Sequence, residues 1–117
     1  MISRIWCGWT THGNADAFED AVRNRHYPML FGKPLPGFRG SQLLRLNRPG
    51  QTEFRNIMWF DNLDDIRALA REDLDKPLLL PPASRELLRR FDMRAEHFEV
   101  CEFRAPSAPQ ASFLDGP

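Results

Sequence analysis

Two short segments about fifty residues apart constrain the fold of this chain, because each places bulky apolar side chains on both faces of a strand. The segments are Ile2–Thr10 and Glu53–Asp61. In the first, Trp6 and Trp9 point to opposite faces, and large aromatic and aliphatic side chains alternate in the same way in the second. A small one-sheet domain normally leaves one face of its sheet in water. We therefore expect helices to cover one face and a partner subunit to cover the other.

The first half of the chain predicts a strand, a helix and a hairpin. Asn14 is a good N-cap for a helix from Ala15 to about His26, and Pro28 is expected to end that helix. A loop over residues 31–40 leads to a strand over residues 41–46. The tetrapeptide Asn47-Arg48-Pro49-Gly50 has the composition of a tight turn, so the next strand returns as a hairpin.

The second half predicts a helix, a short helix and a last strand. The apolar period changes from 2 to 3.6 after Asp61, which indicates a helix over residues 62–71. The pair Pro81-Pro82 is expected to open a short third helix carrying Leu87, Leu88 and Phe91, followed by a strand over residues 93–103. This order predicts an α+β, ferredoxin-like βαββαβ sandwich with a four-stranded antiparallel sheet.

The 117 residues fit one domain over residues 1–103 and a Pro-rich irregular tail over residues 104–117. We expect the tail to dock on its own subunit or on a partner. The apolar loop over residues 73–82 is expected to serve as a dimer clamp rather than a pocket lid.

Composition excludes several classes of partner. Sixteen basic and sixteen acidic residues give a formal charge of zero, so no overall field attracts nucleic acid or a membrane surface. No apolar run approaches the roughly 18 residues of a membrane span, and no export signal opens the chain, so a cytoplasmic location is expected. Cys7 and Cys101 are predicted to be small buried hydrophobic residues, and no histidine pair has metal-ligand spacing, so we expect no metal.

Six segments, spread over residues 1–100, are similar to one known group of proteins. They are Arg4-x-Trp6-x-Gly8-x-Thr10, Asn14-x-Asp16-Ala17-Phe18, Pro36-Gly37-Phe38-Arg39-Gly40, Phe54-x-x-Ile57-Met58-Trp59-Phe60-Asp61, Ile66-Arg67-Ala68-Leu69-Ala70-x-Glu72-Asp73 and Pro81-Pro82. With these segments the chain resembles the antibiotic biosynthesis monooxygenase group of the dimeric α/β barrel superfamily. The resemblance implies a homodimer in which the two sheets pair face to face.

The resemblance also implies two branches of chemistry. Some members add oxygen to an aromatic substrate without flavin, metal or haem, and others degrade haem. The haem-degrading members have an Asn in the first strand, a Trp late in the second helix and an iron-ligating His about ten residues later. This chain has none of these, and Leu78–Leu80 stands where the histidine would be. We therefore disfavour haem degradation and expect no cofactor.

A cofactor-free oxygenase needs a dry pocket, a proton acceptor and a group that stabilises an oxyanion. The candidates for catalysis are Asn56, Trp59 and His97, and the candidates for the substrate pocket are Arg4 and Trp6. An imidazole titrates near neutral pH, an indole stacks on planar substrates, and an amide on an apolar face must find a partner.

Each of these candidate residues could instead have a purely structural role. His97 would then be an edge or interface histidine, the tryptophans would fill the core, and Asn56 would satisfy a backbone group. Arg4 would form an ion pair with Glu53 or Glu99, unless a ligand carboxylate pairs it.

The remaining histidines and the hairpin arginines are expected to be structural. His12 is expected to be a surface turn residue, and His26 to pack in the core or to compensate the dipole at the C-terminal end of its helix. The hairpin arginines Arg39, Arg45, Arg48 and Arg55 are expected to form a solvated face. Two functions follow for the whole chain. The first is a cofactor-independent monooxygenase that acts on an aromatic or polyketide-like compound. The second is a non-catalytic dimer that binds a ligand or serves as an accessory protein.

Overall fold

The computed structural model describes residues 1–70 and 81–106 of the chain. Its elements follow in the order β1 (Ile2–Thr10), α1 (His12–Ala21), the π-helix η1 (Val22–His26), α2 (Tyr27–Phe31), β2 (Phe38–Arg48), β3 (Gln51–Phe60), α3 (Leu63–Ala70), α4 (Pro82–Arg85), β4 (Leu88–Phe91) and β5 (Glu96–Glu99). Among the residues described, no helix is long and apolar enough to cross a membrane.

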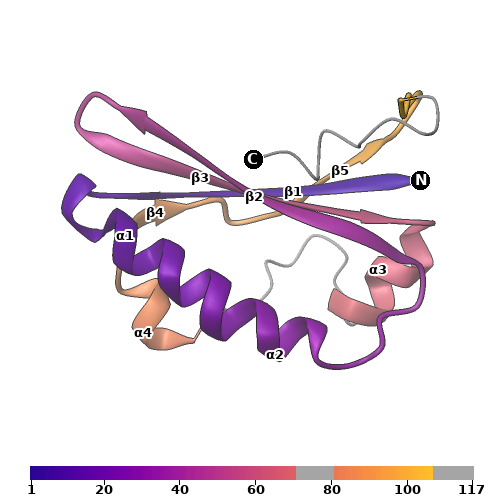
Figure 1. The fold of residues 1–117 in the computed structure, drawn as a ribbon, viewed down its shortest axis with the longest axis horizontal. Helices are drawn as coiled ribbons and strands as arrows, with labels where there is room; N and C mark the ends of the chain where they lie inside the picture. Colours follow the sequence, from indigo (N-terminus) through magenta and orange to yellow (C-terminus); the bar gives the residue numbers. More distant parts are fainter. Residues whose placement is uncertain (71–80, 107–117) are drawn as a thin grey trace.

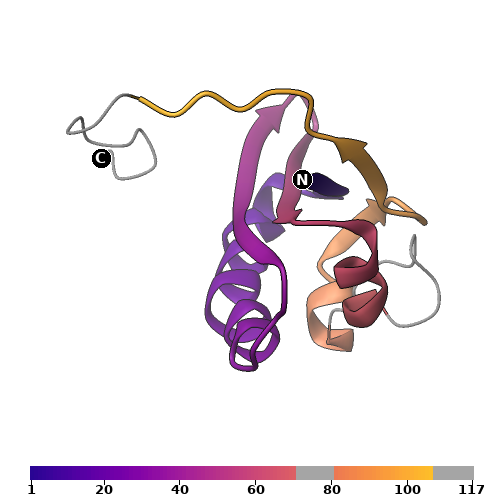
Figure 2. The same ribbon diagram turned by 90° about the vertical axis from the view of Figure 1, so that its right-hand side faces the viewer.

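The strands form one antiparallel sheet with the order β2-β3-β1-β4, and β5 also pairs with β1. Because β4 pairs with Gly8–Thr10 and β5 with Ile2–Ile5, the two short strands share one edge of β1. Together they occupy the fourth strand position. The helices lie on one side of the sheet, and none of the helices formed by residues 1–70 and 81–106 lies on the other side (Figures 1 and 2). The predicted α+β ferredoxin-like sandwich is therefore confirmed, with a sheet that is not closed in one subunit.

The predicted third helix is wrong over most of its length. α4 ends at Arg85, and Leu88–Phe91 forms β4 instead of a helical face. Asp92 then interrupts the edge of the sheet, because its N–H donates to the Cys7 carbonyl at 2.9 Å and its Oδ2 accepts from the Cys7 N–H at 3.0 Å. This side-chain insertion separates β4 from β5. Of the predicted last strand over residues 93–103, only β5 (Glu96–Glu99) forms a strand.

The first helix begins earlier and runs further than predicted. Thr11 is the N-cap, since its Oγ1 accepts from the Asn14 N–H at 3.1 Å. The helical chain also passes through Pro28 and ends at Phe31, so the prediction that Pro28 ends it is wrong. The π-turn η1 precedes the proline, with the Tyr27 N–H bonded to the Val22 carbonyl. Pro28 then stands in the first turn of α2, where a missing N–H costs little.

The hairpin and the second long helix form as predicted. Arg48 pairs with Gln51 across the two-residue loop Pro49-Gly50, and Gly50 has a φ of 79°. The amide oxygen of Asn62 accepts from the Asp65 N–H at 3.0 Å and so caps α3. Most of the predicted dimer clamp, including Leu78–Leu80, and the last part of the predicted tail lie outside the described residues.

The core lies between the sheet and the helices. Even-numbered residues of β1 and β3 share the helix-covered face, as the pairing of Gly8 with Phe54 and of Arg4 with Met58 shows. Two buried clusters result, one around Phe18, Val22 and Phe54 and the other around Met58, Phe60 and Ile66. Cys7 is buried as predicted, but Cys101 is exposed, because the chain beyond β5 leaves the sheet.

Candidate active site

A small cavity lies between the helices and the sheet where the two core clusters meet. It is lined by residues of five elements, namely Arg4, Trp6, Phe18, Val22, His26, Leu43, Phe54, Asn56 and Met58. Its volume is about 30 Å³, which is room for about one water molecule. Most of the wall is apolar, and three polar side chains reach it from β1, η1 and β3.

Arg4 brings a permanent positive charge to the cavity. The residue is 3% exposed, and its Nη1 lies 2.8 Å from Nε2 of His97, its cross-strand partner on β5. A guanidinium in a protein is always protonated and only donates, so the imidazole nitrogen must accept. His97 is therefore neutral when this bond forms, with its proton on Nδ1. The pair holds the Arg4 guanidinium at the wall of the cavity.

Asn56 and Tyr27 form the second polar pair. The amide nitrogen of Asn56 donates to the Tyr27 hydroxyl at 2.7 Å, so the hydroxyl hydrogen of Tyr27 can point elsewhere. Burial raises the pKa of Tyr27 to about 12, which keeps the phenol protonated at neutral pH. Trp6 is also fixed, because its indole N–H donates to the Asp92 carbonyl at 2.8 Å.

His26 lines the cavity, although the sequence had suggested only a structural role for it. It is 7% exposed on η1, and burial lowers its pKa below the ordinary value. The imidazole is thus a neutral base at pH 7. A signal for this position existed in the sequence, because Phe18, Val22 and His26 are spaced four apart and so share one helical face.

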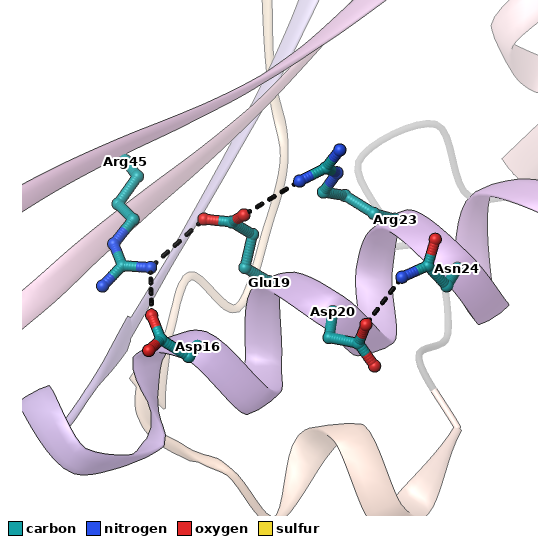
Figure 3. Close-up of polar contacts among 6 residues, drawn as sticks. All are labelled: Asp16, Glu19, Asp20, Arg23, Asn24 and Arg45. Atoms are coloured by element: carbon teal, nitrogen blue, oxygen red, sulfur yellow. Dashed lines mark hydrogen bonds and ion pairs between the residues drawn. The ribbon is translucent and has the colours of Figure 1, made fainter.

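Outside the cavity, a groove of about 490 Å³ runs between α1–η1 and the edge strand β2. Its walls are Glu19, Arg23, Tyr27, Ser41, Leu43 and Arg45. Figure 3 shows Arg45 reaching from β2 to α1, where its Nη1 lies 2.8 Å from Asp16 and 3.1 Å from Glu19. Arg23 approaches the other oxygen of Glu19 at 3.2 Å.

The structure brings four of the five sequence-predicted site residues together. Arg4, Trp6 and Asn56 line the cavity, and His97 contacts it through Arg4. Trp59 does not join them, because neighbouring residues of a strand point to opposite faces. It lies on the open face of the sheet in a hollow with Met1, Gln42 and Phe103 among others.

The sequence had suggested an ion pair between Arg4 and Glu53, and the structure does not show it. Glu53 lies on the open face and accepts from Arg48, Arg55 and the indole of Trp9. These bonds, that from Arg55 first, hold the pKa of the Glu53 carboxyl below its ordinary value. Among the residues that the structure describes, no group of three or more His, Cys, Asp or Glu side chains could hold a metal ion.

Three solved structures share this architecture. The haem degrader MhuD of Mycobacterium tuberculosis, solved with two haems in its active site, is 18% identical, with 89% of this chain and 99% of that one covered and a TM-score of 0.59. SnoaB, a cofactor-independent oxygenase of Streptomyces nogalater solved as a mutant, is 18% identical, with coverage of 93% and 98% and a TM-score of 0.52. An ethyl tert-butyl ether degradation (EthD) family protein of Bacillus halodurans is 20% identical, with coverage of 86% and 99% and a TM-score of 0.52.

By sequence, no family model matches the chain and no curated protein does. At these identities the structural likeness concerns the fold alone. The chain therefore has the fold of the dimeric α/β barrel proteins, the superfamily that its sequence motifs resemble.

Proposed function

We propose that this protein is a cofactor-independent monooxygenase of a hydroxyaromatic or polyketide-like compound. The observation that carries the proposal is the convergence of Arg4, His26 and the Asn56–Tyr27 pair on an otherwise apolar cavity. These groups supply a positive charge, a neutral base and a hydrogen-bonding pair, which are the parts that such a reaction requires. A cofactor-independent oxygenase with the same fold supports the proposal.

The proposed reaction begins with transfer of a substrate proton to His26. The Arg4 guanidinium and the Asn56 amide stabilise the oxyanion that forms, and His97 acts as a positioning residue for Arg4. The electron-rich anion then reduces molecular oxygen. For an anthrone, one oxygen atom becomes the new carbonyl oxygen, and the other leaves as water with the two hydrogens of the oxidised carbon. Trp59 lies on the opposite face of the sheet and has no role in the proposed reaction.

A second function is favoured by the small size of the cavity. At about 30 Å³ the cavity holds no aromatic ring, since a cavity of about 150 Å³ is the size that binds benzene. In a non-catalytic ligand-binding or accessory dimer, the same polar pairs would serve only packing. We do not propose haem degradation, because the residues that the resemblance requires for it are absent from their expected positions in the sequence.

We further propose that two copies pair through the open faces of their sheets. Support comes from three large apolar side chains that stand exposed on that face, Leu44, Leu46 and Phe98. An apolar sheet face of this kind marks an interaction surface.

Oxygen consumption tests the proposed activity. The metal-free protein is mixed with anthrones and naphthohydroquinones, and uptake is compared with protein-free autoxidation. Saturable uptake above the control is expected, and Asn56→Ala or His26→Gln should lower turnover about a hundredfold. Asn24→Ala is the matched control, because Asn24 is exposed on η1 and bonds Asp20 at the surface.

Two results would contradict the oxygenase. One is the absence of excess uptake across the panel, which would favour the accessory dimer. The other is an equal loss of turnover and melting temperature in Asn56→Ala, which would make the amide structural.

A further inference from the structure

The cavity and the outer groove are too closely joined to be separate features. The cavity has about 30 Å³ and the groove about 490 Å³, and only the groove reaches the roughly 300–1,000 Å³ of ordinary ligand pockets. Leu43 lines both. Tyr27 lines the groove while its hydroxyl accepts the hydrogen bond from Asn56 in the cavity. A ligand in the groove would thus lie against the polar pair of the cavity.

Strand register explains why the two spaces meet. In the β2–β3 ladder, Ser41 is paired with Met58, Leu43 with Asn56 and Arg45 with Phe54. Each groove residue of β2 is therefore the direct neighbour of a cavity residue of β3 on the same face. The Arg45 guanidinium also lies 5.7 Å from the centre of the Phe54 ring, within the range of a cation–π contact.

The charges in the groove point to an acidic ligand. Two guanidinium groups, those of Arg45 and Arg23, converge on the single carboxylate of Glu19, one on each oxygen (Figure 3). Glu19 thus occupies the position where a ligand carboxylate would be bound. The side chains of Arg45 and Glu19 are each 31% exposed and that of Arg23 is 65% exposed. Pairs this exposed contribute little stability, so a ligand can displace Glu19 at small cost.

We propose that the groove and the cavity form one binding site for a hydroxyaromatic carboxylate. Its ring lies against Leu43 and Tyr27, its hydroxyl points to Asn56, and its carboxylate is bound by Arg45 and Arg23 in exchange for Glu19. The hydroxyaromatic part of this ligand class rests on the proposed oxygenase function. The carboxylate part rests on the groove alone, and it assigns Arg45 and Arg23 as specificity-determining residues.

Equilibrium binding of two probes tests the site under anaerobic conditions. The probes are 1-hydroxy-2-naphthoate and its uncharged counterpart 1-naphthol. The affinity of each probe is measured by calorimetry. We expect the acid to bind wild-type protein about tenfold more tightly than the neutral probe. Arg45→Gln and Arg23→Gln should each reduce that preference to threefold or less without weakening 1-naphthol. Arg39→Gln is the matched control, because Arg39 also forms an exposed ion pair, with Asp61 at 2.6 Å.

A third variant gives a change of opposite sign. Glu19→Gln removes the one carboxylate that pairs with both Arg45 and Arg23, while Asp16 still pairs with Arg45. The acid should therefore bind this variant several-fold more tightly than wild type, and a loss of structure would not produce such a gain. Equal affinity of the two probes for wild-type protein would overturn the proposal. So would no binding of either probe at millimolar concentration, or equal losses in Arg45→Gln and Arg39→Gln.

The test is independent of catalysis. Selective binding of the acid together with no oxygen uptake would leave the groove assignment standing and remove the oxygenase. Oxygen uptake without any preference for the acid would leave the oxygenase standing and remove the groove assignment.

Discussion

Tyr27 offers a direct optical test of the cavity, because it is the only tyrosine in the chain. Burial raises its pKa to about 12, from about 10 in an unfolded chain. We expect the tyrosinate absorbance of the folded protein to rise with a midpoint near 12, and that of the urea-unfolded protein near 10. A folded midpoint near 10 would mean that the hydroxyl is in water.

The same shift has a consequence for stability. A group whose pKa is higher in the folded state stabilises the protein below its unfolded pKa and loses that effect as pH rises. Stability should therefore fall between about pH 10 and about pH 12. Tyr27→Phe should lack this part of the fall, as pH-dependent urea unfolding of the two proteins would show.

At the scale of single residues, alternation along strands was the dependable guide to the site. It placed Arg4 and Trp6 on one face of β1 and Asn56 on the matching face of β3. The same rule puts Trp59 on the other face, away from Asn56 and the cavity. Tyr27 was out of reach because its position follows a π-turn, which no local pattern had predicted. His26 was within reach, because its spacing from Phe18 and Val22 places it on the same helical face.

At the scale of elements, Asp92 decides where β4 ends and β5 begins. Its carboxylate accepts from the Cys7 N–H at 3.0 Å, and its carbonyl accepts from the Trp6 indole at 2.8 Å. Asp92→Ala leaves the Cys7 N–H in a part-buried site without this acceptor. We expect a loss of about 1–3 kcal/mol in the free energy of unfolding, measured with urea.

Asp20→Ala is the control for that experiment. Asp20 is an exposed carboxylate on α1 that accepts from Asn24 at 2.6 Å, so its removal should change stability by about 0.5 kcal/mol or less. Equal losses in the two variants would contradict the role assigned to Asp92.

The elements that sequence reasoning placed correctly are those with local signals. The Pro49-Gly50 turn and the Asn62 cap act within a few residues of themselves. β4 was not predicted, because it is stabilised as a strand by pairing with β1, which lies more than seventy residues earlier in the chain. Helical spacing at Leu87, Leu88 and Phe91 could not reveal that competition.

At the scale of the whole molecule, the sheet divides the side chains into a covered and an open half. The helices lie on one side (Figure 2), and the cavity lies between them and the sheet. The described end of the chain, residues 100–106, runs over the other side, where Phe103 lines the hollow with Trp59. On the open side Leu44, Leu46 and Phe98 are 43%, 51% and 49% exposed. The two strands with apolar residues on both faces had predicted this division, with helices expected to cover one face and a partner subunit the other.

Dimerisation through the open face is the last prediction. Sedimentation of the wild-type protein should give twice the chain mass of 13.6 kDa. Ile57 lies on that face beside Ile5, its cross-strand partner, so Ile57→Lys would bury a charge in the interface and should give the mass of one chain. Met29→Lys is the control, because Met29 on α2 is 71% exposed on the helical side. A single-chain mass for wild type, or dissociation by Met29→Lys, would show that the open face does not bind a second copy.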